Sequence, residues 1–183
     1  MPEVKLAIST ELQQIHRRLV AYVYMSAMRS GALDRPLLNW LISNLDAYTG
    51  LYEDENTNAK RTLQEFLTYD DAYIMAAGEK VREVKSGRTV SWIRIRTPFL
   101  DTQIGRLVIF DRTVQNRLMG IKTRVEIIND DIELARFYFE KTFDSGLSEK
   151  NSEIIKANLD QARGEIGKKA QRTADLIAEY LSP

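Results

Sequence analysis

Residues 110–139 read FDRTVQNRLMGIKTRVEIINDDIELARFYF, and the spacing of their apolar side chains decides the fold. Apolar residues recur at intervals of four and three along this stretch: Val114, Leu118, Ile121, Val125, Ile128, Ile132, Ala135 and Phe139. Residues three and four apart lie on one face of an α-helix. The stretch therefore predicts a long helix that buries a single stripe.

A second stripe with nearly the same spacing follows, and only Thr173 in it is polar: Ile155, Leu159, Ala162, Ile166, Ala170, Thr173, Ile177 and Leu181 (or Tyr180). The loop between the two stripes, Asp144–Ser148, is short enough to make the helices antiparallel neighbours. Residues 101–181 are therefore predicted to form a long helical hairpin. Neither stripe carries a residue with catalytic chemistry.

The N-terminal residues 8–70 predict a group of helices. The first begins at a capping box formed by Thr10 and Gln13 and ends at Gly31, in the usual left-handed role of glycine. Asp34 caps the second helix, which carries Pro36 in its first turn. It ends at Gly50, a polar loop follows over residues 53–58, and a third helix covers residues 58–69. For residues 72–77 the sequence allows one or two further helical turns.

Residues 79–97 predict a β-hairpin inserted between the two helical parts. Its strands are residues 81–84 and 89–96, and Gly87 supplies a positive φ in the turn over residues 85–88. For residues 105–110 two alternatives remain, a third strand with Asp111 as the cap of the long helix or a helix that already starts at Asp101. The second is preferred because Ile104 and Leu107 extend the apolar stripe. We therefore predict a mainly α single domain over residues 1–183, a helical bundle with this hairpin inserted.

Composition narrows the classes of function. Lys and Arg together number 26, as do Asp and Glu, so the formal net charge is zero, which disfavours nucleic acid as the main partner. The chain has no cysteine, which excludes disulfides and thiolate metal sites. No apolar run is long enough for a membrane span and no signal peptide is recognised, so we expect a cytoplasmic protein without a membrane partner. Segment 51–71 has six acidic and two basic residues, whereas segment 78–97 has two acidic and six basic ones. These opposite charges suit head-to-tail contacts between copies of the chain or ion pairs within one chain, and the second interpretation is favoured.

The residue types that usually carry chemistry are sparse. His16 is the only histidine, and with no second histidine or cysteine to accompany it we expect it to have no functional role. The acidic pair at residues 130–131 and the acidic run at residues 53–55 lack the spacing of a calcium loop, and we interpret both as solvated faces. We therefore predict no catalytic, metal-binding or cofactor-binding residue and no enzymatic activity.

Five residues are candidates for a protein interface. On the second predicted strand Trp92 shares a face with Arg94 and Arg96. The favoured interpretation is a strand face covered by the chain's own helices with the arginines at its rim, followed by a protein interface and then a stacking surface for single-stranded nucleic acid. Ile154 and Leu176 lie beside the second stripe and widen its apolar face, which either docks on a partner or is covered by the N-terminal helices.

Several short segments resemble the tail tubular A, or head-to-tail adaptor, family of short-tailed bacteriophages. These segments are IRIR at residues 93–96, LVIF at 107–110, RTVQNRLMG at 112–120, DDIELA at 130–135 and NTNAKRTL at 56–63. The family's Gly-Trp signature after that last segment is missing, and the apolar stripe continues through Gly120, where the family's helix usually breaks.

The resemblance implies a structural subunit of a homo-oligomeric ring that joins a phage portal to the tail. Its partners would be further copies of itself and the portal and tail proteins, with DNA only as passing cargo, and its location would be the virion, assembled in the host cytoplasm. A rival resemblance compares residues 111–113 with the exit motif of a PAS sensor followed by a signalling helix. That alternative is a cytoplasmic coiled-coil or PAS-like signalling or adaptor module acting as a dimer. The PAS resemblance needs a five-stranded sheet, whereas the first 75 residues have a helical pattern.

Overall fold

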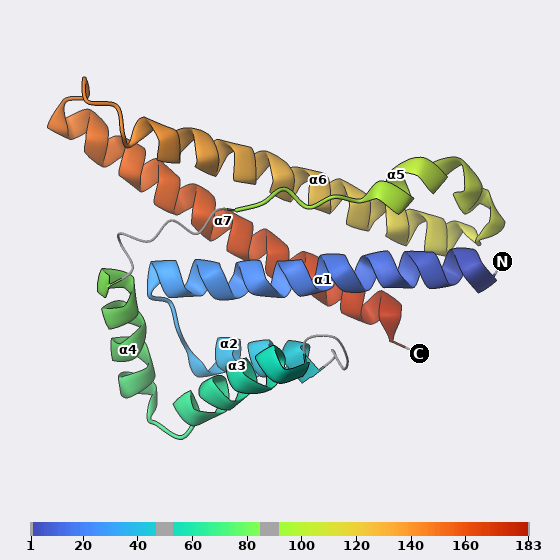
Figure 1. Cartoon of the computed structure of the whole chain (residues 1–183), viewed down its shortest axis with the longest axis horizontal. Helices are drawn as coiled ribbons and strands as arrows, with labels where there is room; N and C mark the ends of the chain where they lie inside the picture. Colours follow the sequence, from blue (N-terminus) through green and yellow to red (C-terminus); the bar gives the residue numbers. More distant parts are fainter. Residues whose placement is uncertain (1, 47–52, 85–91, 183) are drawn as a thin grey trace. The chain divides into compact units, whose positions relative to one another are not determined.

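The computed structural model describes residues 2–46, 53–84 and 92–182, and these residues are mainly helical (Figure 1). The helices are α1 (Pro2–Ser30), α2 (Arg35–Asp46), α3 (Glu53–Phe66), α4 (Asp71–Val84), α5 (Pro98–Gln103), the 3-10 helix η2 (Ile104–Ile109), α6 (Arg112–Lys141) and α7 (Glu149–Leu181). The chain divides into two compact units, residues 1–23 with 91–183, and residues 24–90. The single domain over residues 1–183 stays a prediction.

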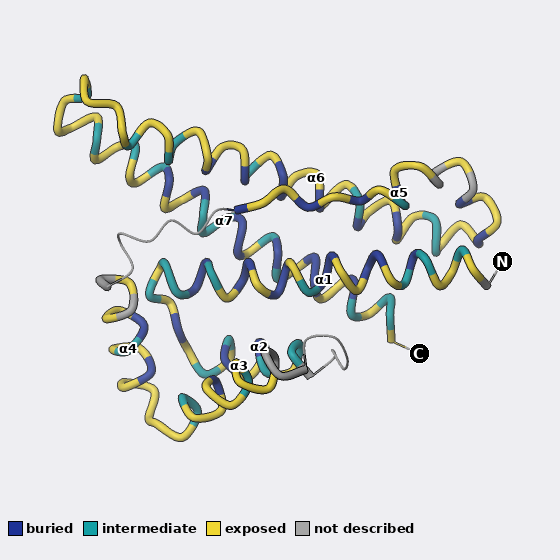
Figure 2. Tube along the Cα trace, viewed as in Figure 1, coloured by how far each residue is buried: buried dark blue, intermediate teal, exposed yellow. Residues whose placement is uncertain are grey.

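The predicted helical hairpin is confirmed. In Figure 1, α6 and α7 lie side by side and antiparallel, and they make the most extensive contact between any two helices of the described chain. Most of the predicted stripe of α6 is buried, and so is most of the stripe of α7, while most of the other residues of the two helices are exposed (Figure 2). Burying one stripe of each helix supplies the hydrophobic stabilisation that helix propensity alone does not give.

The long helix begins later than predicted. Asp111 caps α6 by accepting a hydrogen bond from the backbone N–H of Val114 at 3.0 Å, so the preferred start at Asp101 is wrong. Residues 104–109 are nevertheless helical rather than a strand, in the tighter 3-10 form. Residues 110–111 separate this 3-10 helix from α6. The sequence does not reveal the break, because the apolar residues keep the same spacing before and after it.

The predicted β-hairpin is not seen, and no strand occurs among the described residues. Its first strand lies in α4, which continues to Val84, and its turn at residues 85–88 lies outside the described residues. Residues 92–97, here called the strap, are extended but have no partner strand. Side chains satisfy part of the strap's backbone instead. Tyr22 donates to the carbonyl oxygen of Ile93, and Asn129 bonds both backbone groups of Ile95.

In the unit of residues 24–90, two of the predicted helix boundaries are confirmed. Gly31 ends α1 with φ +71°, and Asp34 accepts from the N–H of Leu37 at 2.8 Å at the start of α2. Other boundaries are wrong. Helix α3 covers Glu53–Phe66 rather than residues 58–69, so residues 53–58 are helical and not a loop. In the other unit, helix α1 starts at Pro2 rather than Thr10. The predicted end at Gly50 lies outside the described residues.

Arg35 fastens the turn between α3 and α4 to the start of α2. Its guanidinium donates to the carboxylate of Asp71 at 2.8 Å and to the carbonyl oxygens of Leu67 at 2.9 Å and Tyr69 at 2.7 Å. Because the guanidinium is planar and rigid, its three hydrogen bonds both stabilise the turn and set its orientation relative to α2.

Gly31 and Gly78 meet in the same unit. A Cβ atom built on Gly78 would lie 2.4 Å from the carbonyl oxygen of Gly31, so the end of α1 and helix α4 approach each other more closely than any side chain at residue 78 allows.

Candidate protein-interaction surface

One side of α6 keeps large apolar side chains in contact with solvent. Met119, Ile127, Leu134 and Phe137 are 41%, 43%, 45% and 51% exposed. At 3.6 residues per turn these positions lie together on the side of the helix away from the buried stripe, and Gly120, Thr123 and the exposed Asp130 lie among them. These seven residues are called the outer face of α6. Scattered exposed apolar residues are ordinary, but four large ones along one side of one helix form a candidate contact surface.

The outer face changes in side-chain size along its length. The two small residues Gly120 and Thr123 lie in the N-terminal half, beside Met119, whereas Leu134 and Phe137 lie in the C-terminal half. A Cβ atom built on Gly120 would meet nothing within 4 Å, so packing within the described chain does not require a glycine there. A glycine inside a helix costs about 1 kcal/mol relative to alanine. The N-terminal half therefore offers an open backbone where another molecule could approach closely.

Charge also changes sign along α6. Residues 112–124 carry four basic side chains and no acidic one, whereas residues 126–140 carry five acidic side chains and one basic one. Part of this charge is satisfied within the chain. Asp131 forms an ion pair with Lys169 of α7 at 2.7 Å, and Arg117 forms one with Glu179 at 3.3 Å. Arg124 and Asp130, both exposed, form no ion pair with any other described residue.

The C-terminal end of the outer face adjoins a group of aromatic rings. The ring of Phe137 lies 5.5 Å from that of Tyr138, edge to face. The ammonium of Lys141 lies 5.8 Å from the centroid of the Phe137 ring. Phe139, at the end of the buried stripe on the other side of α6, forms a separate edge-to-face pair with Phe143 at 5.0 Å. Such contacts hold the rings in fixed orientations and so reduce the side-chain entropy that binding would cost.

The strap places the predicted interface residues differently from a strand. Trp92 is 7% exposed, and its ring meets that of Tyr22 edge to face at 5.0 Å. Burial raises the pKa of Tyr22, although nearby Arg18 and the bond to the Ile93 carbonyl act in the opposite direction. Arg94 and Arg96 are exposed and form no ion pair within the described part of the chain. Trp92 thus belongs to the interior while the two arginines remain available, and their interface role stays a prediction.

The two predicted interface residues of α7 are both exposed, Ile154 at 49% and Leu176 at 36%. They are 22 positions apart, which is about 33 Å along a helix. They therefore do not form one patch with each other, and their interface role also stays a prediction.

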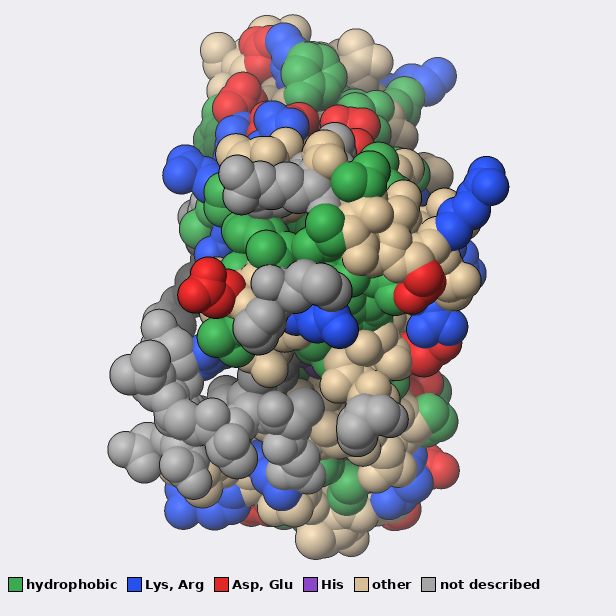
Figure 3. Space-filling model, turned by 90° about the vertical axis from the view of Figure 1, so that its right-hand side faces the viewer, with side chains coloured by type: hydrophobic (Ala, Val, Ile, Leu, Met, Phe, Trp, Pro, Cys, Tyr) green, Lys and Arg blue, Asp and Glu red, His purple; other side chains and the backbone are tan. Residues whose placement is uncertain are grey.

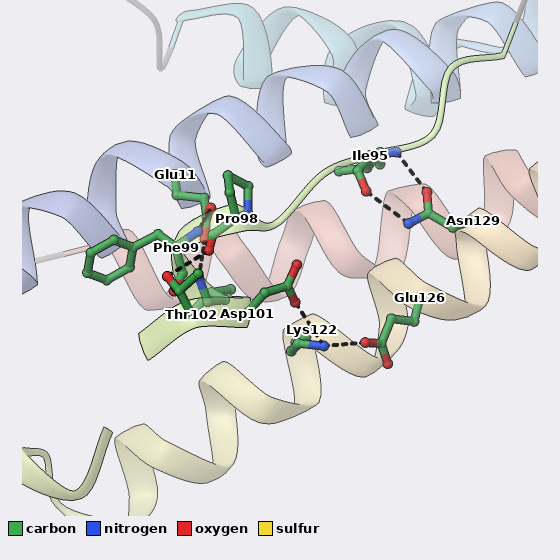
Figure 4. Close-up of polar contacts among 10 residues, drawn as sticks. Glu11, Ile95, Pro98, Phe99, Asp101, Thr102, Lys122, Glu126 and Asn129 are labelled. Carbon is green, nitrogen blue, oxygen red and sulfur yellow. Dashed lines mark hydrogen bonds and ion pairs between the residues drawn. The ribbon is translucent and has the colours of Figure 1, made fainter. Parts of the chain in front are cut away.

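Polar contacts that the sequence did not reveal hold the strap and α5 in place (Figure 4). Asn129 accepts from the N–H of Ile95 at 2.7 Å and donates to its carbonyl oxygen at 2.9 Å. The carboxylate of Glu11 accepts from the N–H groups of Phe99 at 2.7 Å and Leu100 at 2.9 Å, and so caps α5 from another helix.

Lys122 links α5 to α6. Its ammonium contacts Asp101 at 3.1 Å and also bonds Glu126 one turn along α6. Hydrogen bonds to Glu126 and then Asp101 raise the pKa of Lys122. Asn129 could have been noticed as an amide beside the buried stripe, whereas nothing in the sequence around Glu11 or Asp101 indicates these contacts.

Residues with potential chemistry do not gather in the described part of the chain. His16 is buried at 2% exposure, and among the residues that the structure describes no group of three or more His, Cys, Asp or Glu could hold a metal ion. Acidic and basic side chains are intermixed on the face shown in Figure 3 rather than forming a patch of one sign. Within the described ranges, no helix has both the length and the apolar character needed to cross a membrane.

Comparisons of the chain with models of protein families, with curated proteins and with solved structures give no match.

Proposed function

We propose that this protein is a structural subunit rather than an enzyme, and that it acts by contacting other protein subunits, copies of itself among them. The observation that carries the proposal is the outer face of α6, where Met119, Ile127, Leu134 and Phe137 are exposed along one side of a helix. The opposite side of that helix is buried in the hairpin, so the exposed residues are presented on a rigid support. Rigid presentation favours binding because little conformational freedom is lost.

The resemblance to head-to-tail adaptors gives this proposal a specific form. In that form the protein is a subunit of a ring that joins a phage portal to the tail, located in the virion, with DNA passing through the ring. Residues 112–120 and 130–135, which carry part of the resemblance, belong to the single helix α6. The zero net charge is compatible with such a channel, because a strongly basic wall would retain DNA that has to slide.

The alternative form is a dimeric coiled-coil signalling or adaptor module. It is favoured by the continuity of α6 through Gly120, because the adaptor family's helix usually breaks at that glycine. A coiled-coil module needs no β-hairpin, whereas the resemblance to adaptors placed residues 93–96 on a hairpin strand. The PAS-like version of this alternative needs a five-stranded sheet, and no strand occurs among the described residues.

The mass of the assembled protein tests these forms. We would measure purified full-length protein by light scattering coupled to size exclusion, over a hundredfold range of concentration, and image any large species by electron microscopy. A ring of many copies supports the adaptor form, and a dimer supports the signalling or adaptor module. Protein that stays monomeric at every concentration and does not assemble on added portal rings contradicts the proposed function in both forms.

A further inference from the structure

We infer that the outer face of α6 binds the same face of a second copy of this chain, with the two α6 helices antiparallel. The inference rests on the proposed function in one respect, that copies of the chain contact one another. It goes further by naming the surface, the partner and the orientation.

Side-chain size supports the antiparallel orientation. When two copies of one helix are reversed, the N-terminal half of each lies against the C-terminal half of the other. The small residues Gly120 and Thr123 of one copy then face the large residues Phe137 and Leu134 of the other. Space is open at Gly120, so the backbone there can receive an aromatic ring. A parallel arrangement would place Leu134 and Phe137 against their own counterparts and leave a gap between the copies of Gly120 and Thr123.

Charge supports the same orientation. Reversal sets the basic residues 112–124 of one copy along the acidic residues 126–140 of the other, and a parallel arrangement would set like charge against like. Arg124, which forms no ion pair within the described chain, then lies at the edge of the contact near Asp131 of the second copy, whereas the two Asp130 carboxylates come within about one helical turn of each other on the outer face and oppose the contact. Glu126 and Glu133 already contact Lys122 and Arg136 of their own helix, which reduces repulsion between the acidic residues of the two copies.

The symmetry of this contact limits the assembly. A contact in which both copies use the same surface has a twofold axis and closes with two copies. The inference therefore favours the dimeric form of the proposed function over the ring.

The first experiment measures the mass of a double variant, Leu134→Glu with Phe137→Glu. Both side chains are about half exposed, so the hairpin is expected to keep its helical content and melting temperature. We expect wild-type protein to form a dimer of the 21.1 kDa chain, and the double variant to raise the dimer dissociation constant about tenfold or more. The matched control is Leu6→Glu with Met75→Glu, two exposed apolar residues outside α6 and α7, which introduces the same charge and should leave the constant unchanged.

The second experiment tests orientation by cross-linking, which is clean because the chain has no cysteine. One preparation carries Thr123→Cys and another Leu134→Cys. In the antiparallel pair residue 123 of one copy faces residue 134 of the other, whereas two copies of residue 123 are about 16 Å apart along the helices. Mild oxidation should therefore give a covalent dimer in the mixture of the two variants and little in either one alone.

The outcomes separate the inference from the proposed function. If wild-type protein assembles but the double variant assembles equally well, another surface holds the copies together, and the inference is wrong while self-association stands. If Thr123→Cys cross-links by itself as fast as the mixture, the helices are parallel and the inference is also wrong. A wild-type protein that remains monomeric contradicts self-association itself.

Discussion

The side-chain amide of Asn129 bonds both backbone groups of Ile95, accepting from its N–H at 2.7 Å and donating to its carbonyl oxygen at 2.9 Å. Two strands of a sheet exchange the same pair of bonds. One buried amide on α6 therefore takes the place of a neighbouring strand and keeps the strap extended.

Asn129→Leu should destabilise the protein by about 2–5 kcal/mol, because it leaves two backbone groups of the buried Ile95 without partners. Urea unfolding followed by circular dichroism would measure the loss. Asn151→Leu is the control, since Asn151 is exposed on α7 away from the outer face and its replacement should change the stability by less than about 0.5 kcal/mol. Equal effects of the two variants would show that Asn129 does not hold the strap.

Glu11→Ala should cost about 2 kcal/mol, because the N–H groups of Phe99 and Leu100 lose a charged acceptor. The local measurement is hydrogen exchange, which should accelerate at these two amides more than in α7. Glu11→Gln keeps one oxygen acceptor and should fall between Glu11→Ala and wild type. Unchanged exchange at both amides in Glu11→Ala would contradict the capping role.

Val125→Asp should destabilise the hairpin by several kcal/mol, on the order of 3–5, because it buries a charge without a partner between α6 and α7. The same substitution at Val108, which is 74% exposed, is the control and should be nearly neutral. The two melting temperatures give the comparison. If Val125→Asp melts like Val108→Asp, the stripe of α6 is not a core.

Reversing the two strap arginines, Arg94→Glu with Arg96→Glu, should impair assembly more than folding, because both side chains are exposed and form no ion pair with other described residues. Sedimentation velocity would measure the assembled fraction, and the melting temperature would report on folding. A matched reversal of Lys150 and Lys156, two exposed residues of α7, controls for the change in net charge. Normal assembly of the arginine double variant would mean that these side chains are only solvated surface.

Gly78→Ala should be strongly destabilising, by roughly 2 kcal/mol or more, because its Cβ would overlap the carbonyl oxygen of Gly31. Gly164→Ala should act in the opposite direction. Nothing lies within 4 Å of a Cβ built there, so alanine should stabilise α7 by about 0.5–1 kcal/mol. Chemical denaturation of the two variants provides the test, and a loss of stability in Gly164→Ala would show that this glycine has an unrecognised contact.

The helical hairpin could be predicted from sequence because its cause is periodic. The buried apolar residues of α6 follow one another at intervals of three and four, so their spacing predicts both the helix and the side of it that is buried. The cap at Asp34 and the left-handed Gly31 were predictable for a similar reason, since each acts on its immediate neighbours.

The strap could not be predicted because its partners are distant in sequence and are not strands. Val81–Val84 and Thr89–Arg96 have the composition of a hairpin, yet the first segment lies in a helix and the strap is bonded by Asn129, 34 positions from Ile95. Local propensity cannot anticipate a tertiary contact that satisfies the same backbone groups. The outer face of α6 is not evident from the sequence because Gly120, Thr123 and Asp130 interrupt its apolar residues, so it lacks the continuous spacing of the buried stripe.

The contact between Gly31 and Gly78 has a consequence for how this sequence can diverge. Gly31 and Gly78 are far apart in the sequence, but the backbone at Gly31 leaves no room for a side chain at residue 78. A larger residue at position 78 is therefore tolerated only if the backbone around Gly31 moves. Elsewhere the exposed sides of the long helices can change freely, and overall identity should decay quickly among descendants. We therefore expect distant homologues to keep a glycine at each of these two positions, together with the Asp-Arg-Pro sequence at the start of α2, when most other positions differ.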